Sequence, residues 1–432
     1  MSKSSVAYNT AAQLIGKVAT LLLGLATTSI IFRTLGTTEY GAYVFVTSFV
    51  LFFAIISDWG TEIITLREIS QNLINQQKIV ISSLIIRLSL SFVAVFLANV
   101  SIRLYPQWQV FVGPVTLLSL VLIALALKIS AQPLFLARGT ALFGAIGEVI
   151  NNSLYFLAIL MFLPRFPSLM LTISFLIIST LIAGLICWAF VSRLISLKLA
   201  FSKNVARSIV KEALPTGALL AVFYIYNRVD IVILQNLKGN DVVGLYGIAY
   251  KIHDNLVQGA AFLMNAVFPL IAVQSSTKSL RIIYQRAFHV LFIAALFLFA
   301  VIFIAGPSII NLIGGPSAAP AIPLLRILIL ATVFAYLNHL TGYTLIALGH
   351  QRASLIIALT ALSVNISGNL ILIPLFSATA ASFMTLATEA LVFLLSSFAL
   401  YKYTDLLPSF RKISETVYLS LKTRGRIFEN IP

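Results

Sequence analysis

The chain has 432 residues, of which 60% are hydrophobic and only 10% are charged, and its mean hydropathy is +1.02. An ordinary soluble domain is roughly 25% charged, so this composition excludes a soluble globular protein and indicates an integral membrane protein. The formal net charge is +16, and the single cysteine, Cys187, excludes an intramolecular disulfide and a cysteine-based metal site.

Long apolar runs recur along the whole chain. Each run is long enough to cross roughly 30 Å of hydrocarbon as an α-helix, whereas a β-barrel would show alternating strands of about 10 residues. The pattern predicts twelve membrane helices, and the first is expected to be an uncleaved span because no signal-peptide cleavage pattern follows it. In chain order they cover residues 11–32, 40–57, 79–102, 110–136, 141–163, 168–192, 213–236, 242–268, 288–313, 321–347, 353–375 and 378–401.

The basic residues are distributed unevenly over these twelve helices. Of the 29 Lys and Arg residues, nineteen fall in segments on the side of the N-terminus, four in the opposite loops and six within the predicted helices. This bias over short loops is the positive-inside pattern, which predicts a multi-pass protein of the cell membrane with both termini in the cytoplasm. Basic loops of this kind satisfy membrane topology and the anionic lipid surface, so they predict no nucleic-acid partner.

Two local patterns recur in the two halves of the chain at nearly constant separation. They predict a parallel repeat of two six-helix bundles, related by a pseudo-two-fold axis along the membrane normal. The expected domains are an N-terminal bundle at 1–195, a basic cytoplasmic connector at 196–212, a C-terminal bundle at 213–401 and a basic cytoplasmic tail at 402–432. The matched pairs are Gly41 with Gly244 and Tyr43 with Tyr246 at an offset of 203, and Gly139 with Gly349 and Pro164 with Pro374 at an offset of 210.

Polar residues inside the predicted helices are the candidate functional residues. A charged group at the centre of a membrane helix costs at least roughly 2.5 to 3.5 kcal/mol, so it usually faces the bundle interior or a water-filled cavity. In the eighth helix, Lys251 and Asp254 share one face close to the midplane; they either line a transport path or form a structural ion pair, and both can hold. His253 points away from this face and is expected to pack or to hydrogen-bond. The candidates for a substrate cavity are Lys17, Arg87, Lys128, Asn227, Arg228, Lys251, Asn255 and Gln258.

The acidic residues within the predicted helices are candidates for ion coupling or for charge pairs. Glu389 has no partner on its own helix, so it either pairs with a cation elsewhere or carries a proton. Six Lys or Arg against four acidic residues make the predicted interior net basic, which suits an anionic substrate such as a diphosphate. The four acidic residues are Glu148, Asp230, Asp254 and Glu389.

The sequence contains no pattern that predicts catalysis. No phosphate-binding loop ending in GK[ST] occurs, and neither HExxH nor GxSxG is present. We therefore expect no enzymatic activity, no cofactor and no metal site. Transport would be driven by an ion gradient, by the membrane potential or by the gradient of the substrate itself.

Several motifs spread over nearly the whole chain resemble one family. They are Leu214-Pro215, Asn227 to Asp230, Gly239, Gly244, Tyr246, Ala249 to Lys251 and Phe268-Pro269 in the middle, Leu35 to Tyr43 and Asp58-Trp59-Gly60 near the start, and Pro323 to Leu328, Ala347 to Arg352, Asn365, Asn369 and Pro374 near the end. Together they are similar to the polysaccharide-transporter (O-antigen flippase) family of the multidrug/oligosaccharidyl-lipid/polysaccharide exporter superfamily. In one departure, Ser377 and Ala380 stand where that family has glycines.

The resemblance implies two helical bundles around a V-shaped central cavity, with Lys251 and Asp230 at matching positions. It implies alternating-access export of a polyprenyl-diphosphate-linked oligosaccharide, which would be an O-antigen, capsule or exopolysaccharide unit, to the outer leaflet. Membrane lipids and other polysaccharide-assembly membrane proteins are the expected partners. A drug-efflux or peptidoglycan-precursor transporter of the same superfamily is the alternative. A membrane polysaccharide polymerase fits less well, because no predicted outer loop is long enough to carry its catalytic groups.

Overall fold

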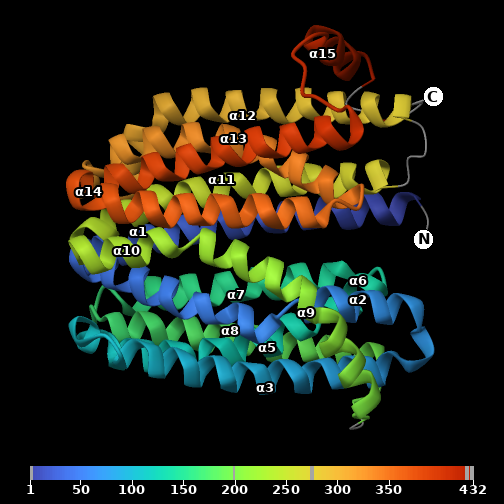
Figure 1. Cartoon of the computed structure of the whole chain (residues 1–432). Helices are drawn as coiled ribbons and strands as arrows, with labels where there is room; N and C mark the ends of the chain where they lie inside the picture. Colours follow the sequence, from blue (N-terminus) through green and yellow to red (C-terminus); the bar gives the residue numbers. More distant parts are fainter. Residues whose placement is uncertain (1–2, 198–199, 273–276, 424–427, 429–432) are drawn as a thin grey trace. The chain divides into compact units, whose positions relative to one another are not determined.

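The computed structural model describes residues 3–197, 200–272, 277–423 and 428, and all regular secondary structure in them is helical (Figure 1). Within this part of the chain, nine helical segments are long and apolar enough to cross a membrane. Two of these segments, built on α1 and α14, each cover two of the predicted spans. The predicted eighth span lies in a further helix, so the all-α membrane fold predicted from the sequence is confirmed.

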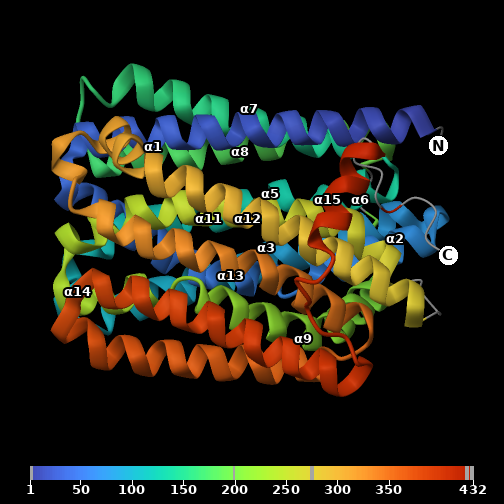
Figure 2. The ribbon, with the colours of Figure 1, turned by 90° about the horizontal axis from the view of Figure 1, so that it is seen from above.

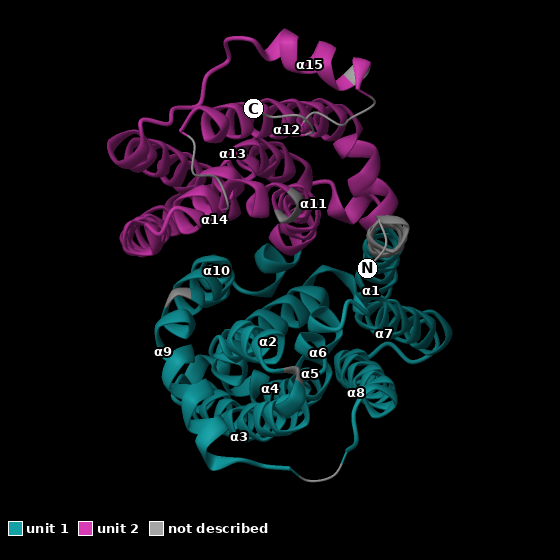
Figure 3. Cartoon of the chain, turned by 90° about the vertical axis from the view of Figure 1, so that its right-hand side faces the viewer, with its two compact units in different colours: residues 1–244 teal, residues 245–432 magenta. Residues whose placement is uncertain are grey.

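The chain divides into two compact units, residues 1–244 and 245–432 (Figure 3). The predicted connector at 196–212 lies inside the first unit, and its residues 203–212 form the start of α9, which packs against α1, α2 and α3. Lys198 of this connector, and Arg424 and Arg426 of the predicted tail, lie outside the described residues. The division into two six-helix bundles stays a prediction.

The first unit is built on α1, which covers the first two predicted spans. The helix is broken at Gly36, whose φ of 77° and ψ of 176° are open to glycine because it has no Cβ. The helices of this unit are α1 (Lys3–Asp58), α2 (Thr61–Gln71), η1 (Leu73–Asn75), α3 (Gln76–Arg103), η2 (Pro106–Phe111), α4 (Val112–Ser119), α5 (Val121–Ser130), α6 (Gln132–Ala137), α7 (Ala141–Phe162), α8 (Leu169–Leu194), α9 (Lys203–Tyr226) and α10 (Val229–Lys238).

The second unit packs α12, α13 and α14 around a core that includes Tyr284, Phe288 and Leu340. Here α14 covers the last two predicted spans and is broken at Ser377, which adopts a φ of 56°. This is a position where the resembling family has glycine, so a serine occupies a conformation that glycine takes at lower cost. The helices are α11 (Asn240–Ala272), which begins in the first unit, α12 (Thr277–Gly314), η3 (Pro316–Ala318), α13 (Ala321–Ala347), α14 (Gln351–Thr404) and α15 (Ile413–Lys422).

The repeat predicted from Gly41 and Gly244 appears in the first unit as a reciprocal contact. A Cβ on Gly41 would lie 1.8 Å from the backbone oxygen of Asn240, and a Cβ on Gly244 would lie 2.3 Å from the backbone oxygen of Thr37. Thr37 and Asn240 are themselves separated by the repeat offset of 203. Equivalent residues therefore meet each other as they would around a local two-fold axis, which supports the repeat. The side chains of another pair at this offset, Thr38 and Asp241, are hydrogen-bonded to each other.

Candidate functional site: buried charges of the membrane helices

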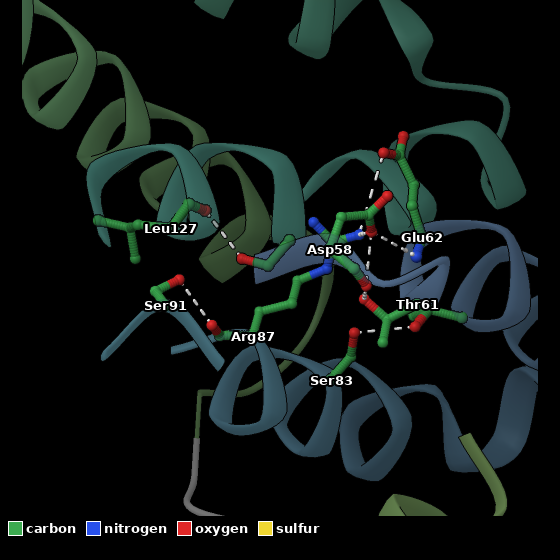
Figure 4. A network of polar contacts seen from close by, with 9 residues as sticks. Asp58, Thr61, Glu62, Ser83, Arg87, Ser91 and Leu127 are labelled. Carbon is green, nitrogen blue, oxygen red and sulfur yellow. Dashed lines mark hydrogen bonds and ion pairs between the residues drawn. The ribbon is translucent and has the colours of Figure 1, made fainter. Parts of the chain in front are cut away.

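Arg87 is the centre of a buried charge network in the first unit (Figure 4). It lies within α3 with only 1% of its surface exposed, and its Nη2 donates to Asp58 Oδ1 in an ion pair. The same nitrogen lies 4.0 Å from Glu62 Oε2. Asp58 ends α1 and Glu62 lies in the first turn of α2, so the turn between the two helices directs both carboxylates at one guanidinium.

The turn that positions these carboxylates is fixed by its own backbone and by α9. Trp59 and Gly60 both have positive φ, at 40° and 76°, and Asp58 Oδ1 accepts the backbone N–H of Glu62 at 3.2 Å. A Cβ on Gly217 of α9 would lie 2.5 Å from the ring of Trp59. The indole therefore packs directly on the α9 backbone, and this contact holds the turn in place.

Buried hydroxyl groups extend the Arg87 network along α3. Ser83 forms a hydrogen bond of 2.8 Å with Thr65, and Ser91 Oγ donates to the backbone oxygen of Arg87 at 2.7 Å. Ser83, Arg87 and Ser91 are spaced by four residues, so they lie along one face of the helix. The four-residue spacing of these three polar residues is visible in the sequence, so it could have predicted that they share one face of α3.

The network changes the charge balance predicted from the sequence. Asp58 lies just beyond the predicted span 40–57, so neither it nor Glu62 was counted among the interior charges. Both compensate Arg87, whose burial and pairing favour a structural ion pair over direct contact with substrate in this conformation. The assignment of Arg87 to a substrate cavity stays a prediction.

A second cluster joins three of the predicted residues from three helices. Lys128 of α5 donates from Nζ to Glu148 Oε2 of α7 at 2.8 Å, and Lys17 of α1 interacts electrostatically with the same carboxylate. Lys128 is buried, whereas 44% of the Glu148 side chain is exposed. The cluster thus holds two ammonium groups around one carboxylate. We call it the Lys128 cluster.

The predicted helix 213–236 is interrupted at Asn227 and Arg228, where α9 ends and α10 begins. Asn227 Nδ2 donates to the backbone oxygen of Phe223 at 2.8 Å, which satisfies a carbonyl near the end of α9. Asp230, in the first turn of α10, is buried, and its Oδ1 accepts the N–H of Ile231 at 2.8 Å. The predicted span thus lies within one segment that could cross the membrane, and its helix is interrupted at two of the predicted cavity residues.

The Lys251 face of α11 belongs to the second unit. Lys251, Asp254 and Gln258 are half-buried, and the pairing of the first two stays a prediction. Asn255 is also half-buried, and its Nδ2 has no hydrogen-bond partner within the described residues. His253 is buried, and its Nδ1 lies 2.8 Å from Thr332 Oγ1 of α13, which confirms the expectation that it hydrogen-bonds away from this face.

Glu389 of α14 has a partner from α13. Asn338 Nδ2 donates to the Glu389 carboxylate at 2.7 Å and to the Glu389 backbone oxygen at 2.8 Å. Nearby in the sequence, Asn369 donates to Asn365 Oδ1 at 2.9 Å, and both side chains are buried. The family resemblance includes both asparagines, and two amides four residues apart in an apolar helix also indicate a side-chain pair by their spacing.

Charged and amide groups buried within long apolar helices define a multi-pass membrane protein with a polar interior. The family model of polysaccharide biosynthesis proteins matches residues 6–274, and the chain belongs to this family. A second family model, MatE, matches residues 215–371. The resemblance predicted from the sequence is thereby confirmed.

Solved structures of membrane transporters share the fold. The lipid II flippase MurJ in an inward closed conformation is 14% identical, with 96% of this chain and 91% of that chain covered at a TM-score of 0.77. An inward-facing multidrug resistance MATE family transporter of the MOP superfamily is 15% identical, with 95% and 99% covered at a TM-score of 0.71. At these identities the likeness establishes the fold of that superfamily.

A curated relative matches part of the chain. An uncharacterized membrane protein of Methanocaldococcus jannaschii is 25% identical over 202 residues, which are 46% of this chain and 47% of the relative. The match thus spans about half the length of that relative.

Proposed function

We propose that the protein is a flippase that moves a polyprenyl-diphosphate-linked oligosaccharide from the cytoplasmic to the outer leaflet of the cell membrane by alternating access, with both termini in the cytoplasm. The observation that carries this proposal is membership in the polysaccharide biosynthesis family over residues 6–274. The transporter fold supports it, because that fold is shared with a lipid II flippase. An ion gradient or the membrane potential would drive transport.

In this proposal, the diphosphate is recognised by lysine side chains that lie within membrane helices. The Lys128 cluster holds two lysines around one carboxylate, and Lys251 is half-buried on a face with Asn255 and Gln258. Ammonium groups bind phosphate oxygens through charge-assisted hydrogen bonds, and such bonds strengthen where water is scarce. Asp254, Asp230 and Glu389 are candidates for ion coupling.

The second candidate substrate class is a peptidoglycan precursor or a drug. Two observations favour it: the MatE family model matches residues 215–371, and the fold is shared with both MurJ and a MATE transporter. Substrate charge separates a cationic drug from the proposed substrate, because the drug would be repelled by the charge that attracts a diphosphate.

Substitution of Lys251 tests the proposed role of this face. In proteoliposomes that contain a fluorescent lipid-linked oligosaccharide, Lys251→Ala should abolish flipping, whereas Lys251→Arg should keep part of it because the positive charge remains. Flipping is measured as the fraction of sugar that an external glycosidase can reach. Lys238→Ala, which removes an exposed lysine at the end of α10, is the matched control and should leave transport unchanged. Wild-type flipping by Lys251→Ala would remove this residue from the mechanism.

A further inference from the structure

The segment that follows the last membrane helix is tied to α12 by a regular series of side chains. Arg281 donates to the carboxylate of Asp405 at 2.6 Å and to its backbone oxygen at 3.0 Å. One turn further along α12, Gln285 donates to the backbone oxygen of Leu407 and accepts the N–H of Ser409 at 3.1 Å. Residues 405–409 therefore run along α12 and do not extend freely from it.

The third residue of α12 that contacts this segment is His289, which is buried and makes a polar contact with each of its ring nitrogens. Nε2 lies 2.8 Å from the backbone oxygen of Ser409, and Nδ1 lies 2.7 Å from Thr416 Oγ1 in α15. Between these two contacts, the ring of Phe410 packs against Phe288, with the ring centroids 5.3 Å apart. These contacts fix α15 beside α12 (Figures 1 and 2).

The position of His289 sets the depth of α15 relative to the membrane. It is the second residue of the predicted span 288–313, and the 25 helical steps from His289 to Gly314 of α12 extend about 38 Å at 1.5 Å each. This length exceeds the roughly 30 Å of the hydrocarbon core and falls within the roughly 40–45 Å that include the headgroups. Figure 3 looks along the membrane helices, and α15 lies in the plane of that view. The axis of α15 therefore runs at a steep angle to the membrane helices. The helix therefore has the depth and direction of an element in the headgroup layer.

The exposed side of this segment is basic and aromatic. Within residues 277–289 and 401–422 there are seven Lys and Arg against two acids, and both acids are already paired, Asp405 with Arg281 and Glu415 with Lys412. The aromatic side chains around them are half or more exposed, and two lysines lie within 6.0 Å of a ring centroid. We call this the tail surface; it comprises Tyr401, Lys402, Tyr403, Phe410, Arg411, Tyr418 and Lys422.

We propose that the tail surface binds the headgroups of anionic phospholipids, so that residues 405–422 form an interfacial anchor held on one side by α12 and on the other by the membrane. Aromatic side chains and cations are the groups enriched at this level of a bilayer. Each cation near an anionic leaflet strengthens its binding by roughly fivefold, which corresponds to about 1 kcal/mol. The partner is thus a lipid surface of negative charge, and this inference does not depend on the transported substrate.

Solvent access at two positions of α15 tests the proposal. Val417 and Glu415 are both exposed and point about 160° apart on the helix, and the native Cys187 is fully buried, so single-cysteine labelling is selective. The full-length Val417→Cys and Glu415→Cys variants are labelled with a fluorophore in nanodiscs of phosphatidylcholine with or without phosphatidylglycerol. Quenching is measured with acrylamide, which is neutral and is not repelled by the lipid charge.

Around α15, Glu415 lies about 20° from Lys422 and about 60° from Tyr418, whereas Val417 lies about 140° and about 100° from them. We therefore expect the Glu415 probe to be quenched several-fold less when phosphatidylglycerol is present, and the Val417 probe to be quenched strongly in both lipids. Removing two cations by Arg411→Gln and Lys422→Gln should abolish the protection. The matched double variant Arg165→Gln and Lys238→Gln, at exposed cations of other loops, should keep it. Equal quenching of the Glu415 probe in the two lipids, or protection that survives the loss of Arg411 and Lys422, would overturn the proposal.

Discussion

The buried pair of Arg87 and Asp58 allows a sharp prediction about stability. Asp58→Ala would leave a guanidinium that is 1% exposed with only Glu62, 4.0 Å away, to balance it. Breaking a buried pair in this way typically lowers the free energy of unfolding by about 3–5 kcal/mol. Because Glu62 still compensates part of the charge of Arg87, we expect a decrease of about 3 kcal/mol. Arg87→Met should cost less, because the carboxylates of Asp58 and Glu62 are 20% and 35% exposed and keep some access to water.

The matched control is a surface pair of the same first unit. Arg67 and Glu212 also form an ion pair, but their side chains are 47% and 38% exposed, so Glu212→Ala should cost no more than about 1 kcal/mol. The free energy of unfolding is measured for the purified variants in detergent by denaturant titration, with monodispersity checked by size-exclusion chromatography. The reasoning is refuted if Asp58→Ala is no more destabilising than Glu212→Ala, or if Arg87→Met is the worst of the three.

Two further predictions concern the backbone, and both are read as shifts in the thermal midpoint of the purified protein. Gly41→Ala should destabilise strongly, because its Cβ would lie 1.8 Å from a backbone oxygen, whereas Gly24→Ala, which has open space around it, should be neutral or stabilising by up to about 1 kcal/mol. A tolerated alanine at 41 would contradict the close approach. Ser377→Gly should stabilise by about 1 kcal/mol or more because it relieves a positive φ, and Ser367→Gly, in the regular helix, should instead lose about 0.5–1 kcal/mol; the same sign at both sites would speak against strain at 377.

Membrane helices could be predicted from sequence because hydrocarbon thickness imposes a length on each apolar run. Their breaks were harder to predict. The break at Gly36 could be expected, because glycine adopts a positive φ without a steric penalty. The break at Ser377 occurs at a residue that rarely adopts a positive φ, and the break at Asn227 lies within a stretch whose sequence predicts one apolar helix. At the latter break the Asn227 side chain donates to the Phe223 carbonyl near the end of α9, whereas the residue type of Ser377 does not predict its positive φ.

The sequence predicted which charged residues lie within membrane helices, but it did not predict which of them interact with each other. Lys17, Lys128 and Glu148 were all identified by their burial in apolar helices, and the structure brings them into one cluster. Asp58 was missed as the partner of Arg87, because a residue just outside the end of a span looks like an ordinary loop residue until the fold brings it to α3. The sequence therefore predicts which charged residues are buried in membrane helices, whereas the tertiary structure is needed to identify the residue that pairs with each of them.

The most direct test of the proposed function compares three substrates in the same proteoliposomes. The purified wild-type protein is offered a fluorescent polyprenyl-diphosphate-linked oligosaccharide, a lipid-linked peptidoglycan precursor and a cationic dye, and transport is compared with protein-free liposomes. The account predicts that the oligosaccharide crosses fastest and that the cationic dye does not cross above background. Transport of the dye alone, or of the peptidoglycan precursor without the oligosaccharide, would contradict it.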